Sequence, residues 1–447
     1  MIIEDRFIDN PLVALFLNND SAKSYHGGKN GNSFKGMPYA FSVLAPFLQE
    51  NEGGAFSGHG LRNASIYPAL IAVTRGMTGT FGMDQEVKYP ARYWHWAEDG
   101  RMQCDLCPRE CKLNDEQRSA CFVRLRDGNQ MVLTTYGRSS GFCIDPIEKK
   151  PLNHFYPGTS VLSFGTAGCN LTCKFCQNWD ISKSKDMDTL MEEATPDMIA
   201  AAAQRHGCKS VAFTYNDPVV FAEYAMDVAD ACHARGIKTV AVTAGYMHDQ
   251  PRQDFYSKID AANVDLKSFS EDFYSKISGA HLLPVLDTLK YLAHKTSVWL
   301  EITTLIIPGK NDSEEELRAL SSWIFRELGA DVPLHFSAFH PDYKMPEVPQ
   351  TPLDTLVRAR SIAIGEGLHY VYTGNIHNVE GDTTYCPECH LPVIVRDWYE
   401  INQYKLLENG VCPLCGATIA GRFDAKAGTF GRNRIPVSMK SAETADA

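Results

Sequence analysis

The distribution of cysteine most constrains what this chain can be. It has 14 cysteines, and 11 of them fall into three tight groups. Grouped cysteines in a cytosolic chain indicate metal sites, whereas in a secreted chain they indicate disulfides. The N-terminus lacks a basic segment followed by an apolar one, so we expect a cytoplasmic protein that binds metal. The groups are Cys104, Cys107, Cys111 and Cys121; Cys169, Cys173 and Cys176; and Cys386, Cys389, Cys412 and Cys415.

Length and charge limit the remaining possibilities. A chain of 447 residues predicts roughly two to four domains, and 44% hydrophobic residues exclude wholesale disorder. The formal net charge of -11 argues against nucleic acid as a partner. No apolar run approaches the ~18 residues that a membrane-spanning helix needs, so we expect no membrane partner.

Strand-like and helix-like patterns alternate in the middle of the chain. This alternation predicts an α/β fold with parallel strands, which places chemistry at the carboxyl ends of the strands. The predicted organisation is an N-terminal extension without a chemical motif over 1–100, a Cys-rich segment with a possible second metal site over 101–159, the α/β core over 160–380, a zinc-ribbon-like module over 381–424 and a disordered tail over 425–447.

The central cysteines follow a predicted strand with the spacing C-x3-C-x2-C. Three thiolates of one loop can bind three irons of a [4Fe–4S] cluster and leave the fourth iron open. A structural zinc site requires four protein ligands, so the alternative is a zinc knuckle that a distant Cys or His completes.

This loop, with an aromatic residue at Phe175 before its last cysteine, resembles that of the radical S-adenosylmethionine (SAM) superfamily. The resemblance implies a partial (β/α) TIM-like barrel in which SAM chelates the open iron. It further implies reductive cleavage of SAM by an electron from a low-potential flavodoxin or ferredoxin. The resulting 5′-deoxyadenosyl radical then abstracts hydrogen from a substrate.

The resemblance extends to the following strand ends. Asn216 and Asp217 lie in a motif similar to the one that holds the SAM amino group, although relatives carry Glu in place of Asp217. Asp265 and Lys267 resemble the D-x-K motif of pyruvate formate-lyase activating enzymes, which contributes to SAM binding. The resemblance therefore implies SAM contacts at Phe175, Asn216, Asp217, Asp265 and Lys267. The alternative for Asp217 is a helix N-cap, because Pro218 follows it. Glu301 in an apolar strand is either a polar residue inside the barrel or an exposed edge residue.

The best match is the radical SAM component of the AmmeMemoRadiSam system, which shares Ile147–Pro151, His335–Ser337 and Tyr370–Asn375. The resemblance covers about residues 104–424 and implies Memo-like and AMMECR-like partner proteins. A second interpretation is an enzyme of the pyruvate formate-lyase activase type, with a glycyl radical protein as its partner. A third is a zinc-binding scaffold without catalysis.

The two outer cysteine groups each supply four thiolates. The C-terminal spacing of two C-x2-C pairs predicts a structural zinc site, with rubredoxin-like iron as the alternative. The N-terminal spacing is compatible with zinc or with an auxiliary [4Fe–4S] cluster. Basic residues beside this group, including Arg109 and Arg124, are interpreted as solvated loop charges or as a partner surface.

Overall fold

The computed structural model describes residues 88–183 and 192–439. Every described residue lies within the unit Gly82–Ala447. The predicted N-terminal extension over 1–100 therefore lies mostly outside the described residues.

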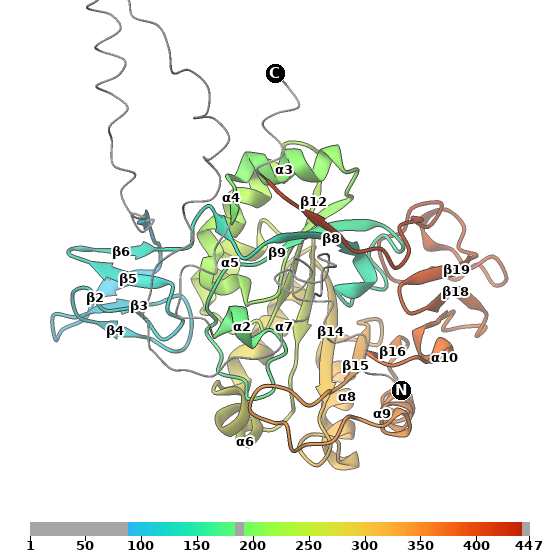
Figure 1. Ribbon diagram of the computed structural model, residues 1–447. Coiled ribbons are helices and arrows are strands. Elements are labelled where there is room, and N and C mark those ends of the chain that lie inside the picture. Colours follow the sequence, from blue (N-terminus) through green and yellow to red (C-terminus); the bar gives the residue numbers. More distant parts are fainter. Residues whose placement is uncertain (1–87, 184–191, 440–447) are drawn as a thin grey trace, which may run out of the picture. The chain divides into compact units, whose positions relative to one another are not determined.

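A nine-stranded sheet forms the centre of this unit, in the order β16-β15-β14-β13-β12-β11-β9-β8-β20 (Figure 1). The strands from β9 to β16 run parallel, which confirms the predicted α/β fold. Two strands at the other edge are antiparallel to their neighbours. The strands are β8 (Phe142–Pro146), β9 (Ser160–Phe164), β11 (Ser210–Phe213), β12 (Lys238–Thr243), β13 (Ala261–Asp265), β14 (Trp299–Ile306), β15 (Leu334–Ala338), β16 (Val371–Gly374) and β20 (Ile435–Val437).

Strand β20 corrects one expectation from the sequence. The segment 425–447 is predicted to be a disordered tail, yet Ile435 pairs with Ile144 of β8. Strand β8 would otherwise present a row of unpaired backbone groups, and β20 satisfies them. The prediction is therefore wrong for the tail up to residue 439, and the last residues lie outside the described part.

The helices that follow the parallel strands begin where the sequence places N-terminal caps. Thr195 accepts a hydrogen bond from the amide of Met198, and Ser313 accepts one from the amide of Glu316. Helix α4 packs on β11 and β12, and α9 packs on β15 and β16. The main helices are α3 (Pro196–Arg205), α4 (Ala222–His233), α5 (Asp249–Tyr256), α7 (Leu282–Lys295), α8 (Glu314–Leu328) and α9 (Leu353–Gly365).

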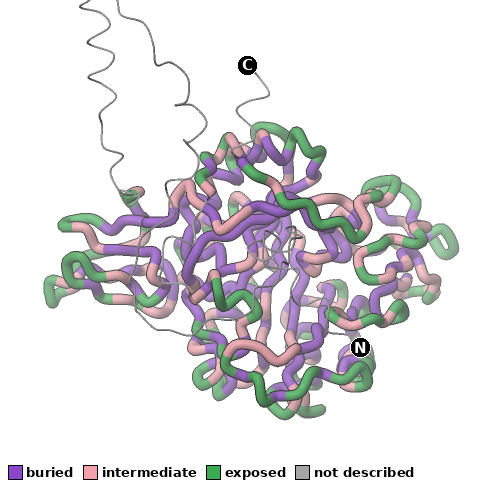
Figure 2. The backbone as a smooth tube through the Cα atoms, in the orientation of Figure 1, coloured by how far each residue is buried: buried purple, intermediate pink, exposed green. Residues whose placement is uncertain are grey.

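The two faces of the sheet have separate apolar cores. The helix-covered face belongs to the large cluster that includes Leu162 and Phe213. On the other face, Val161 and Ala212 pack against the segment 147–156, which begins with the short helix η1 (Ile147–Lys149). Figure 2 shows the resulting burial of the central strands. Side chains alternate across a strand, so each strand contributes to both cores.

The Cys-rich segment before the sheet folds into two small sheets, in the orders β1-β6-β5 and β2-β3-β4. Its apolar residues, including Met102 and Val123, belong to the same cluster as the helix-covered face of the central sheet. Arg124 is fully buried, and its guanidinium contacts the Glu223 carboxylate of α4 at 2.6 Å. The interpretation of Arg124 as a solvated loop charge is therefore wrong. The strands are β1 (Tyr89–Pro90), β2 (Trp94–Trp96), β3 (Met102–Cys104), β4 (Lys112–Leu113), β5 (Arg124–Asp127) and β6 (Gln130–Leu133).

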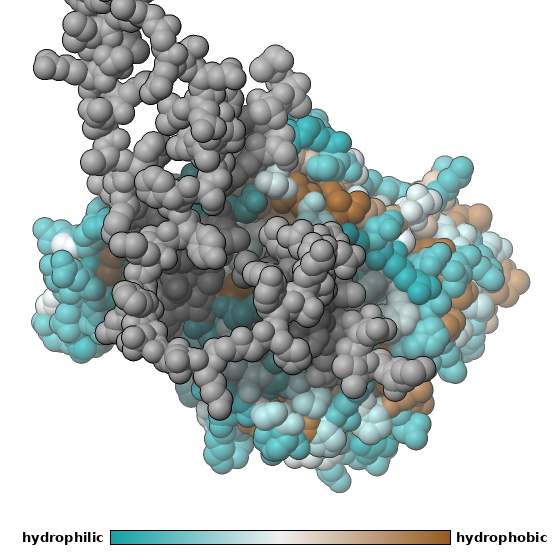
Figure 3. All heavy atoms as spheres, in the orientation of Figure 1, coloured by the Kyte–Doolittle hydropathy of each residue, from teal (hydrophilic) through white to brown (hydrophobic). Residues whose placement is uncertain are grey.

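The C-terminal module contains a third small sheet, made of β17 (Thr384–Tyr385), β18 (Pro392–Asp397) and β19 (Glu400–Tyr404). Tyr370 and Tyr372 pack with the apolar residues of this module, so the module adjoins β16. The surface that Figure 3 presents is mostly hydrophilic where described residues are visible. Among the described residues, each helix is too short or too polar to cross a bilayer.

Candidate metal centre and cofactor site

The central cysteines lie on the loop that directly follows β9, at the carboxyl end of the parallel strands. Backbone hydrogen bonds join this loop to the π-helical turn η4 (Tyr274–Ser278). The amide of Thr172 donates to the carbonyl of Ser278 at 2.9 Å, and the amide of Lys174 donates to that of Ile277 at 3.0 Å. The loop between the first and last cysteine is thus held by a segment that lies about a hundred residues further along the chain.

Gly279 is required at the end of this turn. Its φ of +64° lies in the left-handed region, and an added Cβ would overlap the hydroxyl oxygen of Thr172. Arg109 of the Cys-rich segment donates hydrogen bonds to the carbonyls of Asn170 and Gly279. Arg109 therefore holds the cysteine loop and the π-helical turn together, which corrects its interpretation as a solvated charge.

The environment of the three thiols fits a polynuclear cluster. Cys173 is buried, and burial together with the nearby Cys176 raises the pKa of its thiol. Cys169 interacts electrostatically with Cys173, and burial raises the pKa of Cys169 to about 12. Carboxylates contribute as well, since Asp217 raises the pKa of Cys169 and Asp265 raises that of Cys173. Such thiols become ligands only when a metal displaces their protons.

Asn216 follows β11, and its side chain holds the backbone segment that leads to Cys169. Its side-chain oxygen accepts a hydrogen bond from the amide of Thr166 at 2.9 Å, and its amide group donates to the carbonyl of Gly168 at 2.8 Å. The side chain of Asn216 thus binds the loop backbone itself. Direct contact between Asn216 and SAM stays a prediction.

Asp217 has the helix-capping role that the sequence offers as an alternative. It caps the short helix η3 (Pro218–Phe221) by accepting from the amide of Val219 at 3.1 Å. The same oxygen, Oδ1, accepts from the hydroxyl of Thr243 at 2.8 Å, and the other oxygen, Oδ2, accepts from the amide of Ala244 at 2.9 Å. Burial raises the pKa of Asp217. The carboxylate ties two strand ends together, and its contact with SAM stays a prediction.

Asp265 and Lys267 lie at the end of β13, beside the cysteine loop. The Lys267 ammonium contacts the Asp265 carboxylate at 2.9 Å and lies 5.7 Å from the ring centroid of Phe175. Burial disfavours the charged ammonium, but the Asp265 carboxylate outweighs burial and raises the pKa of Lys267. Cys173 is also close enough to influence this pKa. A fixed cation therefore lies beside the thiols, where an anionic ligand group can bind.

Glu301 lies near the beginning of β14, away from the cysteine loop. It is fully buried, and its carboxylate contacts His335 at 2.7 Å and accepts from the amide of His154 at 2.8 Å. The alternative of an exposed edge residue is therefore wrong. Tyr372 stacks on His335 with ring centroids 5.0 Å apart. This buried network joins strands to the segment 147–156 and lies at the opposite end of the strands from the thiols.

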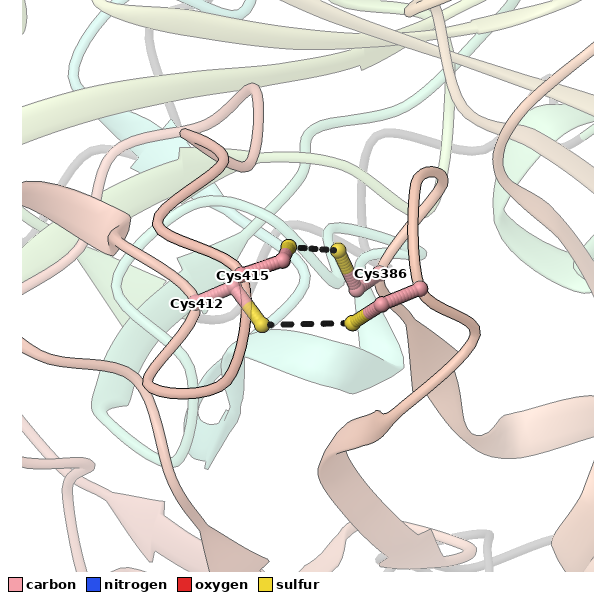
Figure 4. Close-up of side chains that lie close together, drawn as sticks. Cys386, Cys412 and Cys415 are labelled. Atoms are coloured by element: carbon pink, nitrogen blue, oxygen red, sulfur yellow. Dashed lines mark hydrogen bonds between the residues drawn. The ribbon is translucent and has the colours of Figure 1, made fainter.

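The C-terminal cysteines form a compact set (Figure 4). The sulfur of Cys386 lies 3.5 Å from that of Cys415, and the sulfur of Cys389 lies 3.7 Å from that of Cys412. A tetrahedral site with Zn–S bonds of ~2.3 Å has S···S distances of about 3.8 Å. Among the described residues, this is the one group of Cys, His, Asp and Glu whose ligand atoms all lie within 4.8 Å of one another. The geometry fits a single four-coordinate ion.

The N-terminal cysteines also come together, in the Cys-rich segment. Cys104, Cys107 and Cys121 are buried, and Cys111 is half-buried. Burial raises the pKa of the Cys107 thiol, and the other three thiols of the group raise it further. The carbonyl of Cys121 packs directly against Gly168, the residue before Cys169. The first and second cysteine groups are therefore neighbours in space.

The sequence pattern did not reveal the residues that support the cysteine loop. Ser278, Gly279 and Arg109 act through backbone contacts between segments that are distant in sequence. A glycine or an arginine in isolation does not indicate such a contact. Only the positive φ required at Gly279 has a weak local signal, since glycine commonly ends a helical turn.

The chain is similar to several known proteins. Residues 164–320 match the model of the radical SAM superfamily. The uncharacterized protein MJ0808 of Methanocaldococcus jannaschii is 40% identical over 330 residues, which cover 74% of this chain and 98% of that protein. The pyruvate formate-lyase-activating enzyme of Clostridium pasteurianum is 28% identical over 174 residues, which cover 38% of this chain and 70% of the enzyme.

Among solved structures, a radical SAM methyltransferase from Sphaerobacter thermophilus matches with a TM-score of 0.39 and 14% identity, over 68% of this chain and 81% of that chain. The radical SAM domain implies a [4Fe–4S] cluster and SAM as cofactors. Three convergent thiols on one loop fit such a cluster. The chain therefore carries a radical SAM domain, belongs to the family of the M. jannaschii protein and is homologous to pyruvate formate-lyase-activating enzymes.

Proposed function

We propose that this protein is a radical SAM enzyme that uses a [4Fe–4S] cluster to cleave SAM reductively, so that a 5′-deoxyadenosyl radical abstracts hydrogen from a substrate. The observation that carries the proposal is the placement of three cysteines, without a fourth, on the loop that follows β9 at the carboxyl ends of parallel strands. Cys169, Cys173 and Cys176 would hold the cluster.

The neighbouring strand ends would position SAM. Lys267 is a half-buried cation beside Phe175 and suits a carboxylate, which an ammonium binds as a point charge. Asp265 keeps part of its surface exposed, with 33% of its side chain accessible, and can accept hydrogen bonds from a ligand. Asn216 and Asp217 hold the loops at these strand ends in place through their own hydrogen bonds. Their direct contact with SAM is part of the proposal.

The substrate and the partners are proposed from the resemblance to the AmmeMemoRadiSam family. On that basis the enzyme modifies a small molecule or protein and acts with Memo-like and AMMECR-like proteins, with a flavodoxin or ferredoxin as electron donor. A second candidate is the activation of a glycyl radical protein. The match to the Clostridium activating enzyme and the D-x-K sequence at Asp265 and Lys267 support this second candidate.

The C-terminal module is proposed to bind structural zinc through Cys386, Cys389, Cys412 and Cys415. Two sulfur pairs at 3.5 and 3.7 Å support one tetrahedral ion. The buried network that includes His154 links this module to the segment 147–156, because the His154 ring contacts the carbonyl of Ala420 at 2.6 Å. Metal binding would therefore stabilise the packing against the sheet.

The test is SAM cleavage by the full chain after anaerobic reconstitution with iron and sulfide. We expect 5′-deoxyadenosine and methionine to form with SAM and dithionite. Cys176→Ala should abolish both products, because the cluster loses one of its three ligands. Cys208→Ala is the matched control, since Cys208 is a buried cysteine outside the three groups, and it should retain activity.

Deuterium transfer distinguishes the two enzyme candidates. Cell extract or purified candidate partners are added, and deuterium is traced between 5′-deoxyadenosine and other species. A glycyl radical signal on a large protein would support the second candidate. A reconstituted protein that carries the first cluster but forms no 5′-deoxyadenosine under these conditions would refute the proposed function.

A further inference from the structure

The three cysteine groups differ in how closely their sulfurs approach one another. The four C-terminal sulfurs lie within 4.8 Å of one another, as ligands of a single ion must. In the described part of the chain, no three sulfurs of the N-terminal group meet this limit, and neither do the three of the central loop. The N-terminal group thus resembles the central group and not the C-terminal one.

A physical reason connects this spacing to the type of metal centre. Four sulfurs around one zinc are separated by about 3.8 Å, given Zn–S bonds of ~2.3 Å. In an iron–sulfur cluster, each cysteine binds a different iron, so the sulfurs lie farther apart. Hydrogen bonds nevertheless hold the N-terminal group together, because the amide of Cys104 donates to the carbonyl of Cys111 at 2.9 Å.

The surroundings of the N-terminal group suit an anionic centre with several sulfurs. The buried guanidinium of Arg124 interacts electrostatically with Cys104 and Cys121. Ser119 contacts the sulfur of Cys121 at 3.0 Å, and the amide of Ala120 donates to the sulfur of Cys111 at 3.5 Å. Hydrogen bonds to sulfur and a nearby cation are the means by which proteins adjust the potentials of iron–sulfur clusters.

The position of the group relative to the central loop is also defined. Gly168 packs against the carbonyl of Cys121, which leaves no room for a side chain there. Arg109 lies between Cys107 and Cys111 in sequence and binds the carbonyls of Asn170 and Gly279. These contacts attach the N-terminal group to the loop that holds the first cluster.

A cavity of about 420 Å³ borders the group on its accessible side. Cys111 and Arg109 line it together with Tyr246 and His281 from the core domain. Cys111 is the one thiol of the four that is not buried. One edge of the N-terminal centre is therefore open to solvent, whereas the edge at Cys121 adjoins the central loop.

We propose that Cys104, Cys107, Cys111 and Cys121 bind a second iron–sulfur cluster of the [4Fe–4S] type, and not zinc, next to the loop of the first cluster. This inference rests on the proposed function in one respect, namely that the first cluster is bound by the central loop. The cavity beside Cys111 makes this second cluster accessible to solvent, while its other side faces Gly168.

The test measures iron, labile sulfide and zinc per chain after anaerobic reconstitution of the full chain. We expect about eight irons in the wild type, since each [4Fe–4S] cluster contains four. The triple variant Cys169→Ala/Cys173→Ala/Cys176→Ala should retain about four, all bound at the second site. Cys143→Ala, which changes a buried cysteine outside the groups, should keep the wild-type content.

A variant of the second site provides the complementary measurement. The quadruple change of Cys104, Cys107, Cys111 and Cys121 to Ala should also leave about four irons. If this variant does not fold, the triple variant still decides the question. In reduced wild type we expect the electron paramagnetic resonance signals of the two clusters to relax faster than in either variant, because neighbouring paramagnetic centres interact.

The outcomes separate this inference from the proposed function. The second cluster would be overturned if the triple variant contains no iron but binds zinc at the N-terminal group in addition to the C-terminal site. This holds even if the wild type cleaves SAM. A triple variant that retains four irons supports the second cluster even if the wild type fails to cleave SAM. Signals that relax identically in wild type and variants would refute the adjacency of the two clusters.

Discussion

The buried ion pair between Arg124 and Glu223 attaches the Cys-rich segment to helix α4, and its removal should be strongly destabilising. Both side chains have no exposed surface, and the guanidinium lies 2.6 Å from the carboxylate. The other carboxylate oxygen accepts a hydrogen bond from the amide of Arg92 at 2.7 Å. Glu223→Ala would leave a buried guanidinium without its counter-ion.

The expected magnitude follows from this burial. Breaking a buried pair by removing one partner costs about 3–5 kcal/mol, because the remaining charge stays desolvated. With a urea m-value of ~3 kcal/mol/M, a loss of about 3 kcal/mol lowers the urea midpoint by about 1 M. The measurement is urea unfolding of the reconstituted chain, followed by circular dichroism.

An exposed ion pair supplies the matched control. Glu314 pairs with Arg318 at 2.7 Å on α8, and both side chains are 52% exposed. Glu314→Ala should cost less than about 1 kcal/mol, which corresponds to a midpoint shift of roughly 0.3 M. The reasoning is refuted if Glu223→Ala shifts the midpoint no more than Glu314→Ala does.

Three further predictions address the loop, the buried acid and the C-terminal site. Gly279→Ala should lower the iron content after gel filtration, because a side chain at φ +64° costs about 1–2 kcal/mol and its methyl group would overlap Thr172. Adding Thr172→Ala to this variant should restore part of the iron. An iron content that does not recover would contradict the steric explanation. Burial raises the pKa of Glu148 from 4.5 to about 7, so its contribution to the free energy of unfolding falls as pH rises through this range. The stability of Glu148→Gln relative to wild type should therefore improve between pH 4.5 and 7 in urea titrations, and an unchanged difference would refute the shift. Cys412→Ser should remove one equivalent of zinc by elemental analysis without changing the iron content, whereas a loss of iron would place iron at this site.

Local chemistry explains what could be predicted from the sequence. Cysteine spacing identifies three groups of ligands, because loop ligands of a metal centre lie close together in the chain. The alternation of strands and helices predicts the α/β sheet, and residues such as Ser313 mark helix starts through their own hydrogen bonds. The cap at Asp217 was recognised for the same reason, since Pro218 follows it directly.

Contacts between distant segments could not be predicted in this way. Strand β20 pairs with β8 through backbone hydrogen bonds. Many different residues can form such bonds, so the sequence does not indicate this pairing. The side chain of Glu301 has to be buried and paired in an apolar strand, but the sequence does not indicate that His335 is its partner. Exposed and buried arginines are also alike in a sequence, so Arg124 was misinterpreted.

The sequence by itself determined which residues can serve as metal ligands, because the number and spacing of the thiols set how many ligands each group offers. The tertiary structure alone decided which groups are neighbours. Arg109 and Gly279 are 170 residues apart in the chain and meet at the cysteine loop. Packing brings them together through burial and shape, and these depend on the whole fold and not on any short segment.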